Sequence, residues 1–177
     1  MPFIYLSPSV REDNQYIVGG TEEYYMNRIA DAMIPHLRAG GILFARNNPG
    51  NSLSQVIAQS NAGSYDLHLA LHSSSSPEEF RGVLRGPDVY FYTASERGRK
   101  AAELIAENLK TIYPDPGLVT VIPITTHAEL RKTGAIAVLV EIAYHDNYED
   151  AAWIRDHIDE IGKNLAQSVV QYLEIAA

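Results

Sequence analysis

The chain has 177 residues, and its 22 acidic and 14 basic side chains give a formal net charge of −8. Proteins that bind nucleic-acid phosphates usually carry a basic surface, so this negative charge argues against a nucleic-acid partner. The sequence contains no cysteine and six histidines. Disulfides and cysteine nucleophiles are therefore excluded, and any transition-metal site must be built from histidines and carboxylates.

Apolar periodicity predicts strands and helices in alternation along the chain. In chain order we expect a strand at 3–6, a helix between Thr21 and Gly40, a strand at 42–45, a helix at 53–62, strands at 67–72 and 88–92, a helix at 101–112, strands at 118–122 and 135–140, and one long helix after Asn147. Such alternation implies an α/β fold: a single domain with a mostly parallel central sheet and helices on both faces.

The length is typical of one domain, and we expect residues 1–177 to form it. The longest apolar run, residues 135–140, is too short to cross a bilayer. The amino-terminal residues lack a basic region followed by a long apolar segment, so no signal peptide is predicted. We expect a monomer without a membrane span.

Two histidines lie on one side of the strand at 67–72, and its leucines lie on the other side. His72 ends this strand before a run of serines, so it is either a metal ligand at a strand end or a loop histidine. Four strand residues span roughly 13 Å, so His68 and His72 cannot share a metal if the strand is regular. We expect His68 to be a core residue or a neighbour of the site.

Glu141 follows the most apolar strand, where a carboxylate is costly to bury unless it is paired. We predict that Glu141 acts as a general base or a ligand. In open α/β sheets, ligands bind beyond the carboxyl ends of strands. Residues 7–14, His72 and Glu141 all lie at such ends, and His145 follows closely.

The remaining candidates have ordinary structural explanations. His36 and His157 are expected on helices, as structural or solvated side chains. An acid such as Glu22 is common in the first turn of a helix, because it complements the positive helix end. His127 carries no assigned role.

Five segments taken in chain order resemble one known family. They read GTEEYYMNRIAD, RNNP, SNAGSYDLHLALHSSS, RGPDVYFY and AVLVEIAYHDN, and together they span nearly the whole chain. Their order and spacing are similar to those of the zinc-dependent N-acetylmuramoyl-L-alanine amidases, which have a compact α/β catalytic domain.

The resemblance implies hydrolysis of the amide between N-acetylmuramic acid and L-alanine in peptidoglycan, with zinc as the cofactor. It also implies an extracytoplasmic, cell-wall-associated setting such as that of an autolysin, with a muropeptide as the substrate. Arg85 and Asn147 match family positions that we expect to bind this substrate.

The same resemblance assigns the site residues. Glu22, in preference to Glu23, matches the zinc-ligating glutamate at the start of a helix, and His72 matches a zinc-ligating histidine. Glu141 matches the catalytic glutamate, which would take a proton from water and pass it to the leaving amine.

One family ligand is missing. Where the family has its first zinc histidine, this chain has Val10, or Ser9 with a shift of one residue. A catalytic zinc normally has three protein ligands. Either another residue supplies the third ligand, or the site binds metal weakly, or the domain binds cell-wall material without cleaving it. A carboxypeptidase or deacetylase of similar architecture is a further alternative. The leading third ligand is His145, followed by His127, Glu12 and Asp13.

Overall fold

The computed structural model describes residues 1–176 and contains a six-stranded sheet with strand order β2-β1-β3-β6-β4-β5. All neighbouring strands are parallel except β4 and β6, which are antiparallel, so the predicted mostly parallel sheet is confirmed. The strands are β1 Phe3–Pro8, β2 Leu43–Arg46, β3 Leu67–Ser74, β4 Asp88–Tyr92, β5 Thr120–Ile124 and β6 Ala137–Tyr144.

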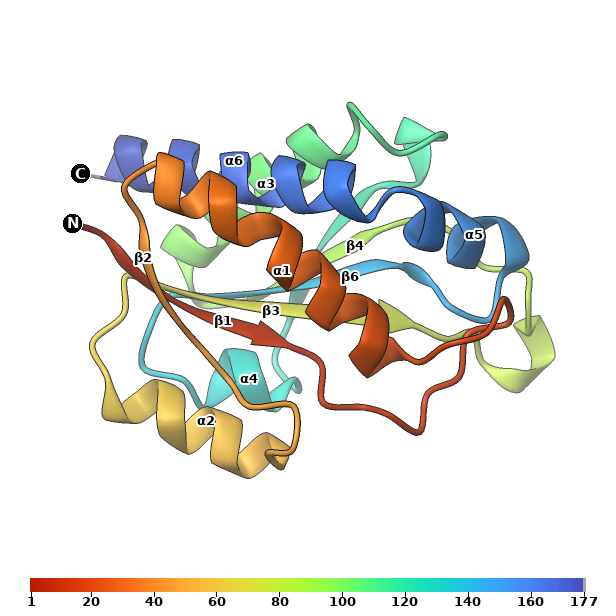
Figure 1. Cartoon of the computed structure of the whole chain (residues 1–177), viewed down its shortest axis with the longest axis horizontal. Coiled ribbons are helices and arrows are strands. Elements are labelled where there is room, and N and C mark those ends of the chain that lie inside the picture. Colours follow the sequence, from red (N-terminus) through yellow and green to blue (C-terminus); the bar gives the residue numbers. More distant parts are fainter. Residues whose placement is uncertain (177) are drawn as a thin grey trace.

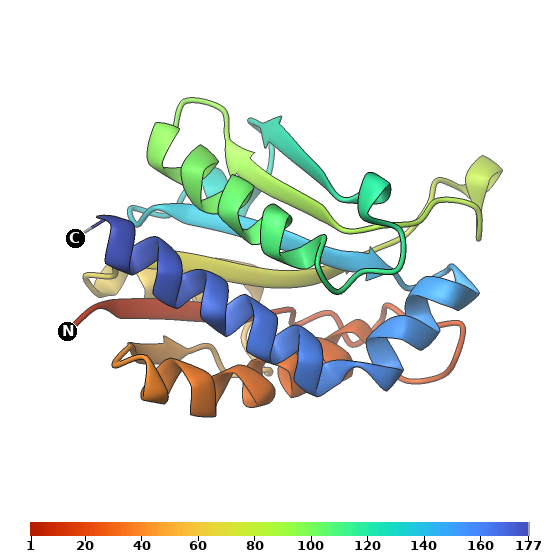
Figure 2. The same cartoon turned by 90° about the horizontal axis from the view of Figure 1, so that it is seen from above.

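Helices cover both faces of the sheet, as expected for an α/β domain (Figures 1 and 2). Helices α1, α3 and α6 lie on one face, and the shorter α2 and α4 lie on the other. Among residues 1–176, no helix is long and apolar enough to cross a membrane. The α-helices are α1 Glu22–Ala39, α2 Leu53–Ala62, α3 Glu96–Leu109, α4 Ala128–Arg131, α5 Tyr148–Asp156 and α6 Ile158–Ala176.

The two faces of β3 are very different in character. Its leucines at 67, 69 and 71 belong to the large core beneath α1, α3 and α6. Ala70 faces the other way, into a small core with Leu130 and Leu139. His68 and His72 share this second face, because strand side chains alternate. The alternation predicted for β3 is therefore confirmed, and it directs both histidines toward α2 and α4.

The loop between β1 and α1, residues 9–21, is held by its own backbone hydrogen bonds. Thr21 caps the helix as predicted, and its side chain accepts a hydrogen bond from the Tyr24 amide at 3.1 Å. The Glu22 amide donates to the Asn14 carbonyl at 2.9 Å. Gly20 has φ +85°, and a Cβ at this position would lie 2.8 Å from the Tyr25 ring. The loop therefore requires glycine where it turns, and it holds Asn14 beside the first residue of α1.

Several boundaries differ from the sequence prediction by a few residues, α4 was not predicted, and the largest differences are in β6 and in the last helix. Strand β6 continues through Glu141 to Tyr144, because β3 pairs with it as far as Tyr144, whereas its pairing with β4 ends at Glu141. The predicted long final helix is wrong, since α5 and α6 are separate helices with His157 between them. His157 Nδ1 lies 2.8 Å from the Trp153 carbonyl. This is the carbonyl that the His157 amide would bind in a continuous helix.

Candidate active site

A pocket of about 280 Å³ opens on the second face of the sheet, near the carboxyl ends of β1 and β3. Its walls come from β1, β3 and β6, from the start of α1 and from α2 and α4, so segments far apart in sequence meet there. The polar residues that line it include Ser7, Ser9, Glu22, His72, Glu129 and Glu141.

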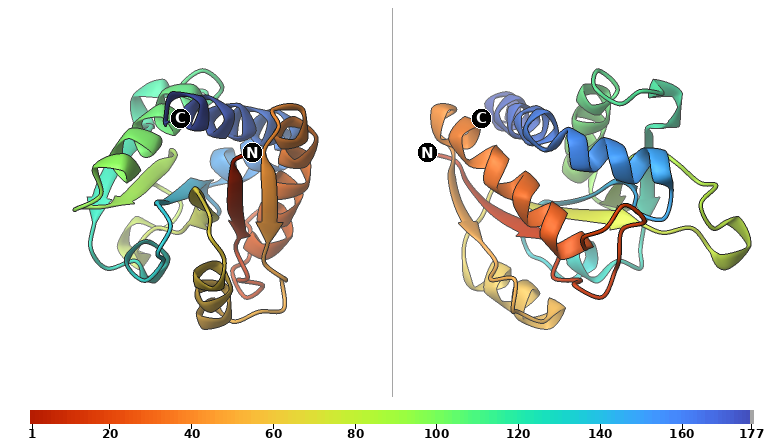
Figure 3. Two further views of the ribbon diagram at one scale, coloured as in Figure 1. Left: turned by 90° about the vertical axis from the view of Figure 1, so that its left-hand side faces the viewer. Right: turned by 45° about the vertical axis from the view of Figure 1, so that its right-hand side comes forward.

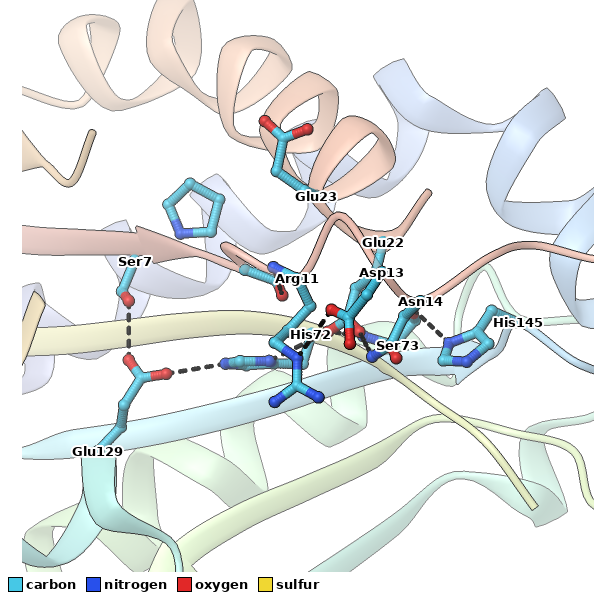
Figure 4. A network of polar contacts seen from close by, with 12 residues as sticks. Ser7, Arg11, Asp13, Asn14, Glu22, Glu23, His72, Ser73, Glu129 and His145 are labelled. Atoms are coloured by element: carbon cyan, nitrogen blue, oxygen red, sulfur yellow. Dashed lines mark hydrogen bonds and ion pairs between the residues drawn. The ribbon is translucent and has the colours of Figure 1, made fainter. Parts of the chain in front are cut away.

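Glu22 reaches the pocket from the first turn of α1 and contacts His72. Glu22 Oε1 lies 3.1 Å from His72 Nδ1 and accepts a hydrogen bond from the Ser73 amide at 3.2 Å. Asn14 donates to the other carboxylate oxygen at 2.6 Å. Glu23 points away from His72 (Figure 4). The choice of Glu22 over Glu23 as the residue beside His72 therefore agrees with the geometry.

Glu129 was not expected in the site, and it contacts the other nitrogen of His72. Its Oε1 accepts from His72 Nε2 at 2.8 Å (Figure 4). Its Oε2 accepts from Ser7 Oγ at 2.7 Å and from His68 Nε2 at 2.8 Å. His68 and His72 thus share one carboxylate, and the expectation that His68 is a buried neighbour of the site is confirmed.

These contacts shift the pKa values of Glu22, His72 and Glu129. Burial acts to raise the pKa of Glu22 and of Glu129, but hydrogen bonds from the histidines outweigh it, and both pKa values lie below their ordinary value. Burial opposes protonation of His72, but the hydrogen bonds to Glu129 and Glu22 raise its pKa well above the usual range. His72 thus lies between two carboxylates, one at each ring nitrogen, and both raise its pKa.

The pKa of Glu141 is shifted in the opposite direction. It lies beside His72 in the register of β3 and β6, and it lines the same pocket. Burial raises its pKa, and the nearby Asp88 carboxylate adds to the increase. Glu141 is thus the one of the three pocket glutamates whose pKa is raised above its ordinary value.

Three other predicted site residues lie away from this pocket. His145 is buried, with Nδ1 2.9 Å from Ser73 Oγ and its ring stacked on Tyr16. Asn147 caps α5 and donates to the Gly82 carbonyl at 2.8 Å. Arg85 pairs with Glu149 at 3.0 Å. The structure gives Asn147 and Arg85 contacts that hold the segment between β3 and β4, which projects from the domain in the right-hand view of Figure 3.

The lesser ligand candidates divide between the pocket and the surface. His127 lines the pocket and packs edge-on against Tyr90, whereas Glu12 and Asp13 are exposed. Arg11, which sequence reasoning passed over, lines the pocket and contacts Asp13 at 3.3 Å. Glu129 was missed because it comes from a short helix on the face of the sheet, whereas the sequence search followed strand ends.

The zinc implied by the family resemblance can be tested against these donors. Glu22 and His72 provide two, and Val10 provides none at the third position. Across residues 1–176, no three His, Cys, Asp or Glu side chains form a group that could hold a metal ion. The donor set therefore does not fit a catalytic zinc with three protein ligands.

The pocket gathers carboxylates and a histidine near the carboxyl ends of strands, where open α/β sheets commonly bind their ligands. Residues 12–172 match the model of the family described as N-acetylmuramoyl-L-alanine amidase. The chain belongs to this family of peptidoglycan hydrolases, which confirms the resemblance noted in the sequence. A comparison with curated proteins gives no match.

Solved structures of amidases share the fold at low sequence identity. The amidase AmiC2 of Nostoc punctiforme is 16% identical with a TM-score of 0.84, and 98% of this chain and 97% of that chain are covered. An amidase from Clostridium difficile 630 is 13% identical with a TM-score of 0.85, at the same coverage. The catalytic domain of the CD27L endolysin, which targets Clostridia difficile, is 21% identical with a TM-score of 0.78, and 97% of each chain is covered.

Proposed function

We propose that this chain cleaves the amide between the lactyl group of N-acetylmuramic acid and L-alanine, with Glu141 as the general base. The observation that carries this proposal is the contrast among the pocket glutamates. Contacts with His72 lower the pKa values of Glu22 and Glu129, whereas the pKa of Glu141 is raised. Surroundings that push the pKa values of neighbouring acids apart indicate which one exchanges protons during catalysis.

The role of Glu141 follows from the chemistry of amide hydrolysis. An amide is a poor electrophile with a poor leaving group, so the attacking water must lose a proton and the departing nitrogen must gain one. A single carboxylate can carry the proton from the water to the amine of L-alanine. We take residues 1–177 as one catalytic domain that acts as a monomer on a muropeptide of the cell wall, outside the cytoplasm.

A second function is favoured by the missing ligand at Val10. With two of the three expected zinc donors, the domain would bind peptidoglycan in the same pocket without cleaving it. Two donors are too few to assign zinc a step in the reaction, and His145, the leading candidate for a third ligand, has its Nδ1 atom 2.9 Å from Ser73 Oγ. Metal content of the purified protein and its dependence on added zinc address this point directly.

The test uses wild-type protein and the Glu141→Gln variant, with purified peptidoglycan as the substrate. We expect the wild type to release stem peptides with a new amino-terminal L-alanine. The variant should lose at least about 100-fold in rate, which is the usual scale of a lost general base, and should still sediment with insoluble peptidoglycan. The exposed Glu160→Gln variant is the control and should keep full activity.

The alternatives give different results. Sedimentation of the wild type without peptide release would identify a binding module. Release of a different product, such as a carboxy-terminal amino acid or acetate, would identify a carboxypeptidase or a deacetylase. Unchanged hydrolysis by Glu141→Gln would show that another group is the base.

A further inference from the structure

Glu129 is a buried carboxylate to which the family resemblance assigns no role. Its side chain is 4% exposed, and it extends from the four-residue helix α4 into the pocket. It accepts three hydrogen bonds, from Ser7, His68 and His72. Both oxygens are therefore occupied, and all three donors lie on strands β1 and β3.

Packing alone does not account for a carboxylate at this position. The neighbouring Leu130 and Leu139 belong to the small apolar core on this face, so an apolar residue would suit the surroundings. Burying charged groups is costly even when they are paired, and an apolar replacement of a buried ion pair is often neutral or stabilising. The presence of a carboxylate at position 129 is thus explained by the side chains that it holds in place, Ser7, His68 and His72.

The contacts of Glu129 fix its orientation before it meets His72. Oε2 is anchored by Ser7 and by His68, and His68 is itself anchored by Ser60 Oγ, 2.8 Å from its Nδ1. The carboxylate therefore cannot rotate without breaking these bonds. Oε1 then receives the Nε2–H of His72, and the Nδ1 atom on the far side of the ring faces Glu22.

Functional histidines commonly use the two ring nitrogens for different tasks. One nitrogen acts in the site, while the other donates its N–H to a carboxylate that sets the ring orientation. We propose that Glu129 is the positioning residue of the active site, which holds His72 through Nε2 so that Nδ1 is presented beside Glu22. The inference rests on the proposed function in one respect: it takes the pocket that contains His72 as the place of the reaction.

The experiment compares wild type, Glu129→Gln and Glu129→Ala, each checked for folding by circular dichroism. In ¹⁵N-histidine-labelled protein, the Nε2–H of His72 should give a slowly exchanging proton resonance, identified by its loss in His72→Gln. We expect this resonance to disappear in Glu129→Ala. The value of kcat on muropeptide should fall about 10- to 100-fold, the scale seen when a carboxylate partner of a functional histidine is removed, with little change in KM.

Two further arms separate positioning from a structural role. Formate added to Glu129→Ala should recover part of the lost kcat, because it can occupy the space of the missing carboxylate. Glu129→Gln should retain more activity than Glu129→Ala, since its amide oxygen can still accept from His72. The exposed Glu160→Gln variant should match the wild type throughout.

The outcomes distinguish this inference from the proposed function. An unchanged His72 resonance in folded Glu129→Ala would overturn the positioning role, whatever the activity. An unchanged kcat in both variants would do the same. A wild type that shows the expected resonance and no hydrolysis would instead refute the amidase reaction and leave the contact between Glu129 and His72 established.

Discussion

Three glutamates in the pocket differ in pKa because their neighbours differ. Glu22, Glu129 and Glu141 are the same amino acid, and all three line one pocket. Two of them contact His72 and have lowered pKa values, whereas the third is half-buried near Asp88 and has a raised pKa. The sequence around each glutamate does not show whether folding will raise or lower its pKa.

The raised pKa of Glu141 predicts an effect on stability as well as on activity. A carboxylate whose folded-state pKa lies above its ordinary value of 4.5 destabilises the folded protein as the pH rises through that raised value. Glu141→Gln removes this penalty. We therefore expect the melting temperature of the variant to exceed that of the wild type at neutral pH.

The difference should shrink as the pH falls toward the ordinary pKa, because the wild-type carboxyl group is then protonated in both states. Thermal melts followed by circular dichroism between about pH 4 and pH 8 measure it. Glu160→Gln, at an exposed position, should show no such pH-dependent gain. A Glu141→Gln variant that is less stable than the wild type at neutral pH would contradict the raised pKa.

Among the elements, the loop between β1 and α1 controls the position of Glu22. Its backbone is closed by the hydrogen bond from the Tyr16 amide to the Gly20 carbonyl at 2.9 Å. The side chain of Asn14 then meets the Glu22 carboxylate. A change in the turn is therefore expected to move two groups of the pocket at once.

Gly19 and Gly20 provide a matched pair of substitutions in this turn. Both have positive φ, at +89° and +85°, but only at Gly20 would a Cβ meet another group, the Tyr25 ring. Gly19→Ala should lose about 1–2 kcal/mol of stability from left-handed backbone strain alone. Gly20→Ala should lose more and should also reduce activity. Urea denaturation measures the difference, and equal losses in the two variants would contradict the contact with Tyr25.

For the molecule as a whole, the packing of α1 against α6 places the site. Gly162 of α6 lies so close to α1 that a Cβ there would be 2.6 Å from the Ala32 Cβ. The first residue of α1 is Glu22, so this close contact between helices fixes one end of the pocket from the opposite face of the sheet.

Substitutions at Gly162 test this packing. Gly162→Val should lower the free energy of unfolding by about 1–3 kcal/mol, the usual cost of overpacking a core. Gly162→Ala should cost less, because its higher helix propensity returns up to about 1 kcal/mol. Denaturant titration gives both values. Lys163→Val, at the neighbouring exposed position, is the control, and a loss there equal to that of Gly162→Val would exclude the proposed close contact.

Much of the fold could be predicted because its signals are local. The caps at Thr21 and Asn147, the limits of α2 and the alternation of β3 all depend on residues close together in the chain. Two predictions that were wrong depended on contacts that the pattern of apolar residues does not record. Strand β6 extends past Glu141 because the distant strand β3 pairs with it as far as Tyr144. The last helix divides where the His157 side chain reaches the Trp153 carbonyl, a local contact that apolar periodicity does not detect.

The sequence by itself determined the α/β class, the family, and the residues Glu22, His72 and Glu141 as candidates, because composition, periodicity and motif order are properties of the chain alone. It also determined that Val10 stands where a histidine is expected. Tertiary structure alone decided what surrounds His72. Hydrogen bonds, burial and pKa depend on atoms brought together by folding, and these placed Glu129 against His72 and directed His145, Arg85 and Asn147 to contacts elsewhere.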